Sequence, residues 1–81
     1  MYYVYILKSK LTDDLYKGCT EDLKKRFDEH NSGKVKSTKP FRPWTLVYYE
    51  AHLNKTLARK AELFYKTSQG RRQIKKKLGL E

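Results

Sequence analysis

The pattern of apolar and polar residues along the chain predicts three strands. Residues 2–8 (YYVYILK) and 15–20 (LYKGCT) are rich in aromatic and β-branched residues, which is typical of strands, and the short polar segment between them predicts a hairpin. Residues 44–50 (WTLVYYE) predict the third strand. Pro43 directly precedes it, at a position where a missing backbone N–H costs least.

A helix is predicted between the second and third strands. Thr20 can cap it, and Glu21 and Asp22 stand in its first turn, where the helix dipole favours acidic side chains. It runs to about His30 and ends near Gly33, which can adopt the left-handed conformation that closes many helices.

Two further helices are predicted after the third strand. The first begins near Asn54, because apolar residues recur on one side of it: Leu57, Ala58, Ala61, Phe64 and Tyr65. The segment SQG at 68–70 is expected to end this helix, and residues 71–79 form a short last one. The predicted class is therefore α/β: a single domain over residues 1–81 with a small, mainly antiparallel three-stranded sheet flanked by helices, in the order β-β-α-β-α-α.

Charge points to a polyanionic partner. Nineteen Lys and Arg against nine Asp and Glu give a net charge of +10, which attracts nucleic acid first and an anionic membrane second. Many of the cations lie in two segments that have no acidic neighbours. For both segments, the alternative to a role in phosphate binding is an ordinary solvated surface. They are Lys34, Lys36, Lys39 and Arg42 in a proline-containing loop, and Arg71, Arg72, Lys75, Lys76 and Lys77 near the end of the chain.

Several classes of protein and site are excluded by the composition. The single cysteine, Cys19, rules out an internal disulfide, and two histidines beside it are too few for a four-ligand structural zinc site. A free thiol suggests a reducing compartment, so we expect a cytoplasmic protein. No apolar run is long enough for a signal peptide or a membrane helix, so we expect no membrane partner.

Five residues are candidates for chemistry, each with an ordinary structural alternative. Arg26 and His30 lie one turn apart beside the apolar stripe of the first helix, at the boundary of core and solvent, and the alternative is a solvated helix edge. Glu62 can bind a hard divalent cation or simply pair with a lysine one turn later. Tyr5 and Tyr16 lie on neighbouring strands, where tyrosines usually pack half-buried.

The order of these residues resembles the GIY-YIG nuclease family. The resemblance consists of YVYIL at 3–7, YKG at 16–18, T-x-D-L-x-x-R-x-x-x-H-N-x-G at 20–33, LVYYE at 46–50, and A-x-x-x-E ending at Glu62. It covers nearly the whole chain and is greatest with stand-alone, single-domain bacterial members. Related domains are found in homing endonucleases, DNA excision-repair nucleases and some restriction enzymes.

The resemblance implies a role for each candidate. Tyr5 and Tyr16 match the two motif tyrosines around the attacking water, and Gly18 matches the glycine that permits close backbone approach. Arg26 matches the arginine that faces the scissile phosphate, and His30 the histidine one turn later. Glu62 matches the carboxylate that holds a single divalent cation, Mg²⁺ or Mn²⁺. The general base is either a tyrosine whose pKa is lowered by nearby positive charge or His30.

Two positions depart from the family pattern. Tyr3 stands where the first motif is named for glycine, and Lys17 stands where a bulky aliphatic residue is usual. Because side chains alternate along a strand, Lys17 is expected to face away from Tyr16. It then either marks an exposed part of that face or adds a phosphate contact.

The leading hypothesis is a metal-dependent DNA endonuclease or nickase of low intrinsic sequence specificity, since no base-reading helix is recognisable. Repair, recombination and defence are all compatible with it. Sharp target choice would need DNA shape, a homodimer or a targeting protein. The alternative, suggested by the small size, is a nucleic-acid-binding module that keeps the nuclease fold with little or no catalysis. A third reading is an adaptor whose basic tail binds an acidic protein.

Overall fold

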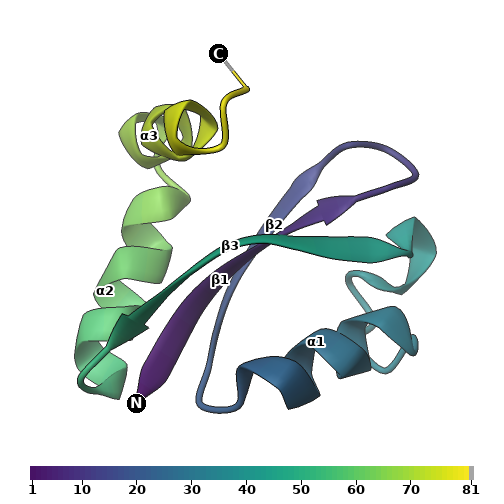
Figure 1. The fold of residues 1–81 in the computed structure, drawn as a ribbon, viewed down its shortest axis with the longest axis horizontal. Helices are drawn as coiled ribbons and strands as arrows, with labels where there is room; N and C mark the ends of the chain where they lie inside the picture. Colours follow the sequence, from purple (N-terminus) through teal and green to yellow (C-terminus); the bar gives the residue numbers. More distant parts are fainter. Residues whose placement is uncertain (81) are drawn as a thin grey trace.

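The computed structural model describes residues 1–80 and confirms the predicted α/β fold (Figure 1). The three strands form an antiparallel sheet in the order β2-β1-β3, and the element order is β-β-α-β-α-α with one added 3₁₀ turn, η1. The bounds are β1 Tyr2–Ser9, β2 Leu15–Thr20, α1 Leu23–Asn31, η1 Lys39–Phe41, β3 Trp44–His52, α2 Lys55–Tyr65 and α3 Ser68–Lys77.

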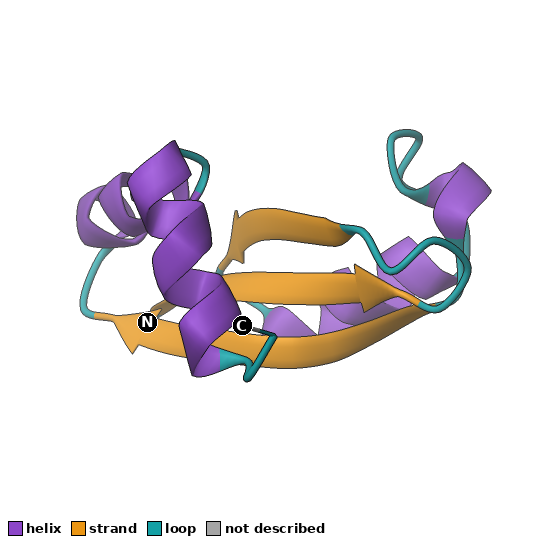
Figure 2. Cartoon of the chain, turned by 90° about the horizontal axis from the view of Figure 1, so that it is seen from above, coloured by secondary structure: helices purple, strands orange, loops and turns teal. Residues whose placement is uncertain are grey.

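The central strand β1 supplies both faces of the sheet with core residues. Val4 and Ile6 face α2 and α3, where Ala58, Tyr65 and Ile74 complete an apolar core. The alternate residues of β1 face α1 on the opposite side, as Figure 2 shows for the helices on the two sides of the sheet. There, the buried residues are Tyr5, Leu7 and Trp44, with Leu23 and Phe27 of α1 packed against them.

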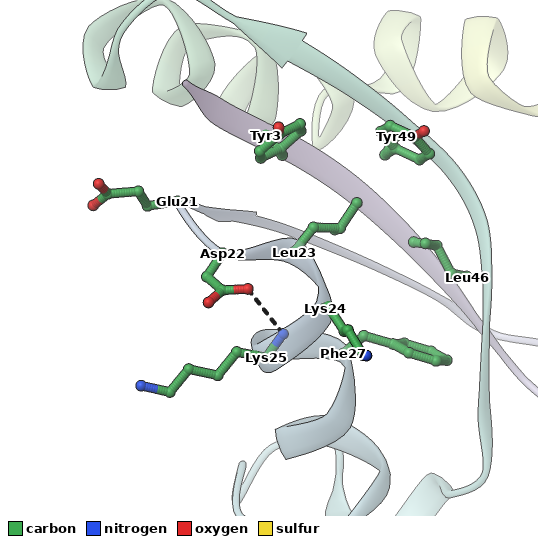
Figure 3. Close-up of a pocket in the computed structure, with 9 residues that line it drawn as sticks. All are labelled: Tyr3, Glu21, Asp22, Leu23, Lys24, Lys25, Phe27, Leu46 and Tyr49. Atoms are coloured by element: carbon green, nitrogen blue, oxygen red, sulfur yellow. Dashed lines mark hydrogen bonds between the residues drawn. The ribbon is translucent and has the colours of Figure 1, made fainter.

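The N-cap of the first helix lies two residues later in the chain than predicted. Asp22, and not Thr20, is the N-cap of α1, because the Asp22 carboxylate accepts a hydrogen bond from the backbone N–H of Lys25 (Figure 3). Thr20 instead accepts from the backbone N–H of Asp22 and so shapes the turn that leads into the helix. Gly33 follows the helix with φ +83°, which confirms the predicted left-handed end.

The segment SQG was expected to break the helical structure, and that expectation is wrong. Ser68 to Gly70 form the first turn of α3, with Thr67 as N-cap accepting a hydrogen bond from the Gly70 N–H. A Cβ at Gly70 would overlap the backbone carbonyl of Phe64, so glycine is needed for the close contact of α2 with α3 rather than for a break. No helix within residues 1–80 has the length and apolar character needed to span a membrane.

Candidate active site

Four of the five candidate residues meet on the α1 face of the sheet. β1 contributes Tyr5, β2 contributes Tyr16, and α1 contributes Arg26 and His30. The Tyr16 ring packs edge-on against the His30 ring, with 5.0 Å between centroids, and the Tyr5 ring does so at 5.7 Å. The two tyrosines therefore flank the same imidazole from adjacent strands.

Tyr5 lies at the centre of this group. Its hydroxyl is hydrogen-bonded to Nε2 of His30 at 2.8 Å, and the residue is only 2% exposed. Burial raises the pKa of Tyr5 to about 12, although the neighbouring Arg26 guanidinium opposes that effect. Gly18 pairs directly with Tyr5 across the β1–β2 ladder, and a Cβ there would overlap the phenol. Gly18 thus provides the space that the Tyr5 side chain occupies.

His30 is fully buried, which corrects the expectation that it lies at the boundary of core and solvent. Its second ring nitrogen, Nδ1, is 2.7 Å from Oγ1 of Thr38, so both nitrogens have partners. Burial, and then the positive charge of Arg26, lower the pKa of His30 to about 4 despite the opposing effect of Glu29. The imidazole is therefore neutral near pH 7.

Arg26 is the charged member of the group that reaches solvent. Its side chain is 38% exposed, and Nη1 donates to Oε1 of Glu29 at 3.1 Å. The guanidinium also lies close to the Tyr5 hydroxyl, where its positive charge opposes the rise in the pKa of Tyr5. A planar group with five donors can make these contacts and still present donors to an anion outside.

Glu62 lies apart from the other four candidates. It belongs to α2, on the opposite face of the sheet, although its negative charge is near enough to raise the pKa of Tyr5 by a small amount. Only 7% of its side chain is exposed. Lys66 Nζ donates to its Oε2 at 3.0 Å, and Arg59 Nη1 lies 3.5 Å from its Oε1. The structure thus contains the pair with Lys66 that was the ordinary alternative for Glu62.

The predicted phosphate-binding residues fall into two groups on different sides of the molecule. Those of the loop are exposed around η1, next to the buried Thr38; they are Lys34, Lys36, Lys39 and Arg42. Lys17 faces away from Tyr16, as predicted: Lys17 pairs with Ile6 and Tyr16 with Leu7, so the two side chains lie on opposite faces. Lys17 lines a hollow with Arg71 and Lys75 of α3, whereas Arg72 is exposed outside it.

The groove drawn in Figure 3 is a separate feature. Its wall is formed by Tyr3, Leu23, Phe27, Leu46 and Tyr49, with charged side chains of the first turns of α1 at its rim. None of the five candidate residues lines it.

A family model described as the GIY-YIG catalytic domain matches residues 1–77. The chain belongs to the GIY-YIG family. This membership supports a nuclease-type function and a nucleic acid as substrate.

Relatives of this GIY-YIG chain match it over most of their length. This chain is 42% identical over 72 residues to UPF0213 protein SpyM3_1077 of Streptococcus pyogenes serotype M3. The match covers 88% of this chain and 77% of that protein. The values are the same for UPF0213 protein MGAS9429_Spy1198 of Streptococcus pyogenes serotype M12. The solution NMR structure of UPF0213 protein BH0048 from Bacillus halodurans is 35% identical, with a TM-score of 0.56, and the match covers 91% of this chain and 82% of that one. These names state no activity.

A divalent cation is compatible with the side chains of this GIY-YIG domain. Residues 1–80 contain no group of three His, Cys, Asp or Glu side chains that could hold a metal ion together. Mg²⁺ nevertheless binds in many nucleotide sites through one or two carboxylates, with water and phosphate oxygens as the other ligands. Glu62 fits that role as a single carboxylate, provided that the half-exposed Lys66 moves off its Oε2.

Sequence reasoning assigned no role to two polar residues near the site, Asn31 and Thr38. Thr38 is 1% exposed and contacts His30, as described above. Asn31 accepts from the backbone N–H of Trp44 at 2.6 Å and donates to its carbonyl at 3.0 Å, which ties the end of α1 to the start of β3. The only signal in the sequence was Asn31 in the quoted H-N-x-G motif; Thr38 sits in an unremarkable polar loop and gave none.

Proposed function

We propose that the protein is a divalent-metal-dependent endonuclease that hydrolyses phosphodiester bonds in DNA, by nicking or structure-directed cleavage, with low intrinsic sequence specificity. The observation that carries the proposal is the Tyr5–His30 hydrogen bond, with Arg26 close to the same phenol and Tyr16 against the same imidazole. A site of this composition can hold a phosphate and orient a water molecule beside it.

Arg26 is the proposed phosphate ligand. Hydrolysis of a phosphodiester requires the negative charge on the non-bridging oxygens to be stabilised, and an arginine fork does this with two parallel donors. Because Glu29 accepts a hydrogen bond from the guanidinium and the Tyr5 hydroxyl lies close to it, its orientation is restricted before the substrate binds. Preorganised donors of this kind lower the barrier more than mobile ones.

Tyr16 and Tyr5 have different proposed roles, because their burial differs. Tyr16 is half-buried and is the tyrosine that can contact water or substrate directly. Tyr5 is almost fully buried and has its hydroxyl between Arg26 and His30. We therefore assign Tyr16 to the attacking water and Tyr5 to the support of Arg26. With a pKa near 4, His30 is unprotonated at neutral pH and serves as a hydrogen-bond acceptor rather than as an acid.

Glu62 is the proposed ligand of Mg²⁺ or Mn²⁺. When bound, such an ion supplies Lewis-acid stabilisation and orients the phosphate. In the absence of the ion, Lys66 and Arg59 neutralise the buried carboxylate. Ion binding and these two cations therefore compete for the same oxygens, and low metal concentrations favour the ion-paired form.

The net charge of +10 supports DNA as the partner. The loop cations around η1 lie on the side of His30 and Thr38, and the cations of α3 lie with Lys17 on the other face. Two separated groups of cations can contact backbone phosphates on both sides of the site without reading bases. Target choice is then left to DNA shape, to a second copy of the chain or to a targeting protein. We keep the cytoplasm as the proposed location, because Cys19 is a free thiol.

A plasmid-nicking assay with Mg²⁺ or Mn²⁺ tests the proposal. Arg26→Ala and Glu62→Ala are each expected to lower the rate by about 100-fold or more. Lys25→Ala and Glu21→Ala are matched controls, since each removes the same charge from an exposed position on or just before α1. If linear, supercoiled and branched DNA all stay intact after incubation with the wild type and either metal, this result counts against an endonuclease.

The second candidate function is DNA binding with little or no catalysis. It is favoured by the pairing of both Glu62 oxygens with cations and by the burial of Tyr5. Salt-dependent DNA binding by wild type without cleavage supports this candidate. Cleavage that is lost in Arg26→Ala while the affinity for DNA is retained rules it out.

A further inference from the structure

We propose that Thr38 is a positioning residue that selects the tautomer of His30 and, through Tyr5, holds Arg26 in place. This inference rests on the proposed function, because it concerns the residue assigned to the phosphate. It is carried by a line of hydrogen bonds that runs from Tyr5 through His30 and Thr38 into the loop after α1, with Arg26 close to the Tyr5 hydroxyl.

The line has fixed chemistry at both ends. At one end Arg26, which lies close to the Tyr5 hydroxyl, can only donate, and at the other end the backbone carbonyl of Val35, which also accepts from the N–H groups of Thr38 and Lys39, can only accept. Between them lie the contacts of Tyr5 with His30 at 2.8 Å and of His30 with Thr38 at 2.7 Å. The Thr38 hydroxyl donates to the Val35 carbonyl at 3.3 Å.

The direction of every bond in the line follows from these ends. In the proposed arrangement the one proton of the Thr38 hydroxyl goes to Val35, so the hydroxyl accepts from Nδ1–H of His30. A neutral imidazole carries one N–H, which leaves Nε2 bare to accept from the Tyr5 hydroxyl. The Tyr5 oxygen then presents lone pairs, and not its proton, to the nearby guanidinium of Arg26. All donors point the same way, an arrangement in which neighbouring bonds strengthen one another.

The opposite tautomer disrupts the contact with Arg26. If Nε2 carried the proton, it would donate to the Tyr5 oxygen, and the Tyr5 proton would turn toward the guanidinium, where it meets only donors. Because His30 and Tyr5 are buried, water cannot readily relieve that conflict. The guanidinium would then face a proton instead of a lone pair on Tyr5, and only Glu29 would still accept from it.

Thr38 is itself held by the start of β3. The indole Nε1 of Trp44 donates to the Thr38 carbonyl at 2.9 Å, and Trp44 is clamped at its backbone by Asn31. Asn31 directly follows His30 in the chain. The loop is thereby closed over α1, which fixes the distance between the hydroxyl of Thr38 and the ring that it orients.

The tautomer of His30 can be read directly by ¹⁵N NMR of the imidazole at pH 7, without DNA or metal. In the wild type and in Thr38→Ser, the proton is expected on Nδ1. In Thr38→Val, which keeps the shape but loses the hydroxyl, the proton is expected on Nε2 in a substantial part of the molecules. The ring signals of His52, which lies on the other face beside Glu50, are the internal control and should not change.

Nicking kinetics give the second readout. In Thr38→Val, kcat should fall about 10- to 100-fold with KM for DNA unchanged, whereas Thr38→Ser stays within about threefold of wild type, as for other outer partners of functional groups. An Nε2–H tautomer in the wild type overturns the proposal, and this result does not depend on whether Thr38→Val folds. Equal kcat for the Val and Ser variants overturns it as well. A wild type that does not nick DNA contradicts the proposed function, while the tautomer comparison still decides the role of Thr38.

Discussion

The face of the sheet under α2 and α3 buries mainly apolar side chains, with the ion-paired Glu62 beside them, whereas the face under α1 buries several neutral polar groups among its aromatics. On the first face, Val4, Ile6 and Ile74 are fully buried. On the second, Ser9, His30 and Thr38 are buried at 0–1% exposure. All buried side-chain polar atoms of residues 1–80 have a hydrogen-bond partner, so the second face is ordered without an unmet polar group.

The comparison separates stability from positioning. Apolar burial is not directional and tolerates changes of shape, whereas buried hydrogen bonds demand one geometry and are costly when one partner is removed. A domain of 81 residues has a small core, so the use of buried volume for polar groups is a real cost in stability. The line of hydrogen bonds under α1 is therefore better explained by function than by folding.

Truncation on the apolar face should have the largest effect on folding. Ile74→Ala is expected to lower the free energy of unfolding by about 2–5 kcal/mol, because it leaves a cavity between α3 and β1, and the milder Ile74→Val by about 0.5–1.5 kcal/mol. Urea denaturation measures both. Leu63→Ala on the exposed side of α2, where Leu63 is 51% exposed, is the control and should change it by less than about 0.5 kcal/mol. Equal losses at the two positions would show that α3 does not close this core.

Acid should weaken the α1 face through His30. The pKa of His30 is about 4 in the folded protein, against an ordinary value of 6.5, because of burial and Arg26. The unfolded chain thus takes up a proton between these values and the folded protein does not. Above pH 6.5 the protonation of His30 does not affect the free energy of unfolding. As the pH falls from there to about 4, the free energy of unfolding decreases by roughly 3 kcal/mol in total.

Unfolding free energies measured across this pH range check the effect of acid. His30→Gln should remove this part of the pH dependence, and His52→Gln, on the other face, should retain it. A His30→Gln variant whose pH dependence matches that of wild type would contradict the assignment.

Removal of one hydroxyl should cost more under α1 than under α2. Tyr5→Phe leaves the buried Nε2 of His30 without its partner, at a cost of about 1–3 kcal/mol. Tyr48→Phe is the matched change on the other face, where Glu50 still accepts from Tyr65 and stays beside His52, so we expect less than about 1 kcal/mol. Chemical denaturation of both variants provides the comparison. Similar costs would mean that the two faces depend equally on their polar groups.

The smallest effect on folding is expected at Lys17. Burial, together with the like charges of Arg71, Lys75 and Lys66, lowers the pKa of Lys17, so its charged form is disfavoured in the folded protein. Lys17→Met should therefore raise the free energy of unfolding slightly, by less than about 0.5 kcal/mol.

DNA binding should show a clearer effect of the same change. If Lys17 neutralises a phosphate, the slope of log affinity against log salt becomes shallower by about 0.9 in Lys17→Met. The exposed Lys10 is the control for both measurements. An unchanged slope removes Lys17 from the DNA-binding surface.

The sequence alone determined the fold because its signals are local. Runs of aromatic and β-branched residues marked the strands, the polar segment after residue 8 marked the hairpin, and Asn54 marked the start of α2, where its side chain accepts from the Leu57 N–H. The helix boundary at residues 68–70 was wrong, because the segment SQG was taken as a break and Gly70 in fact belongs to the first turn of α3. Its actual role is a close contact with the Phe64 carbonyl, which depends on how α2 and α3 pack.

The candidate residues were also chosen from the sequence, through the ordered motifs that resemble a known family. Their catalytic roles remain predictions. What only the tertiary structure decided is how they are arranged: Tyr5 buried behind Arg26, His30 inside the core, and Glu62 on the opposite face in ion pairs. Thr38 joined them through a contact between residues eight positions apart, one on α1 and one in the loop after it. Spacing along a chain predicts which residues share a helix turn or a strand face, but the direction of a hydrogen bond depends on both partners and on what lies beyond each of them.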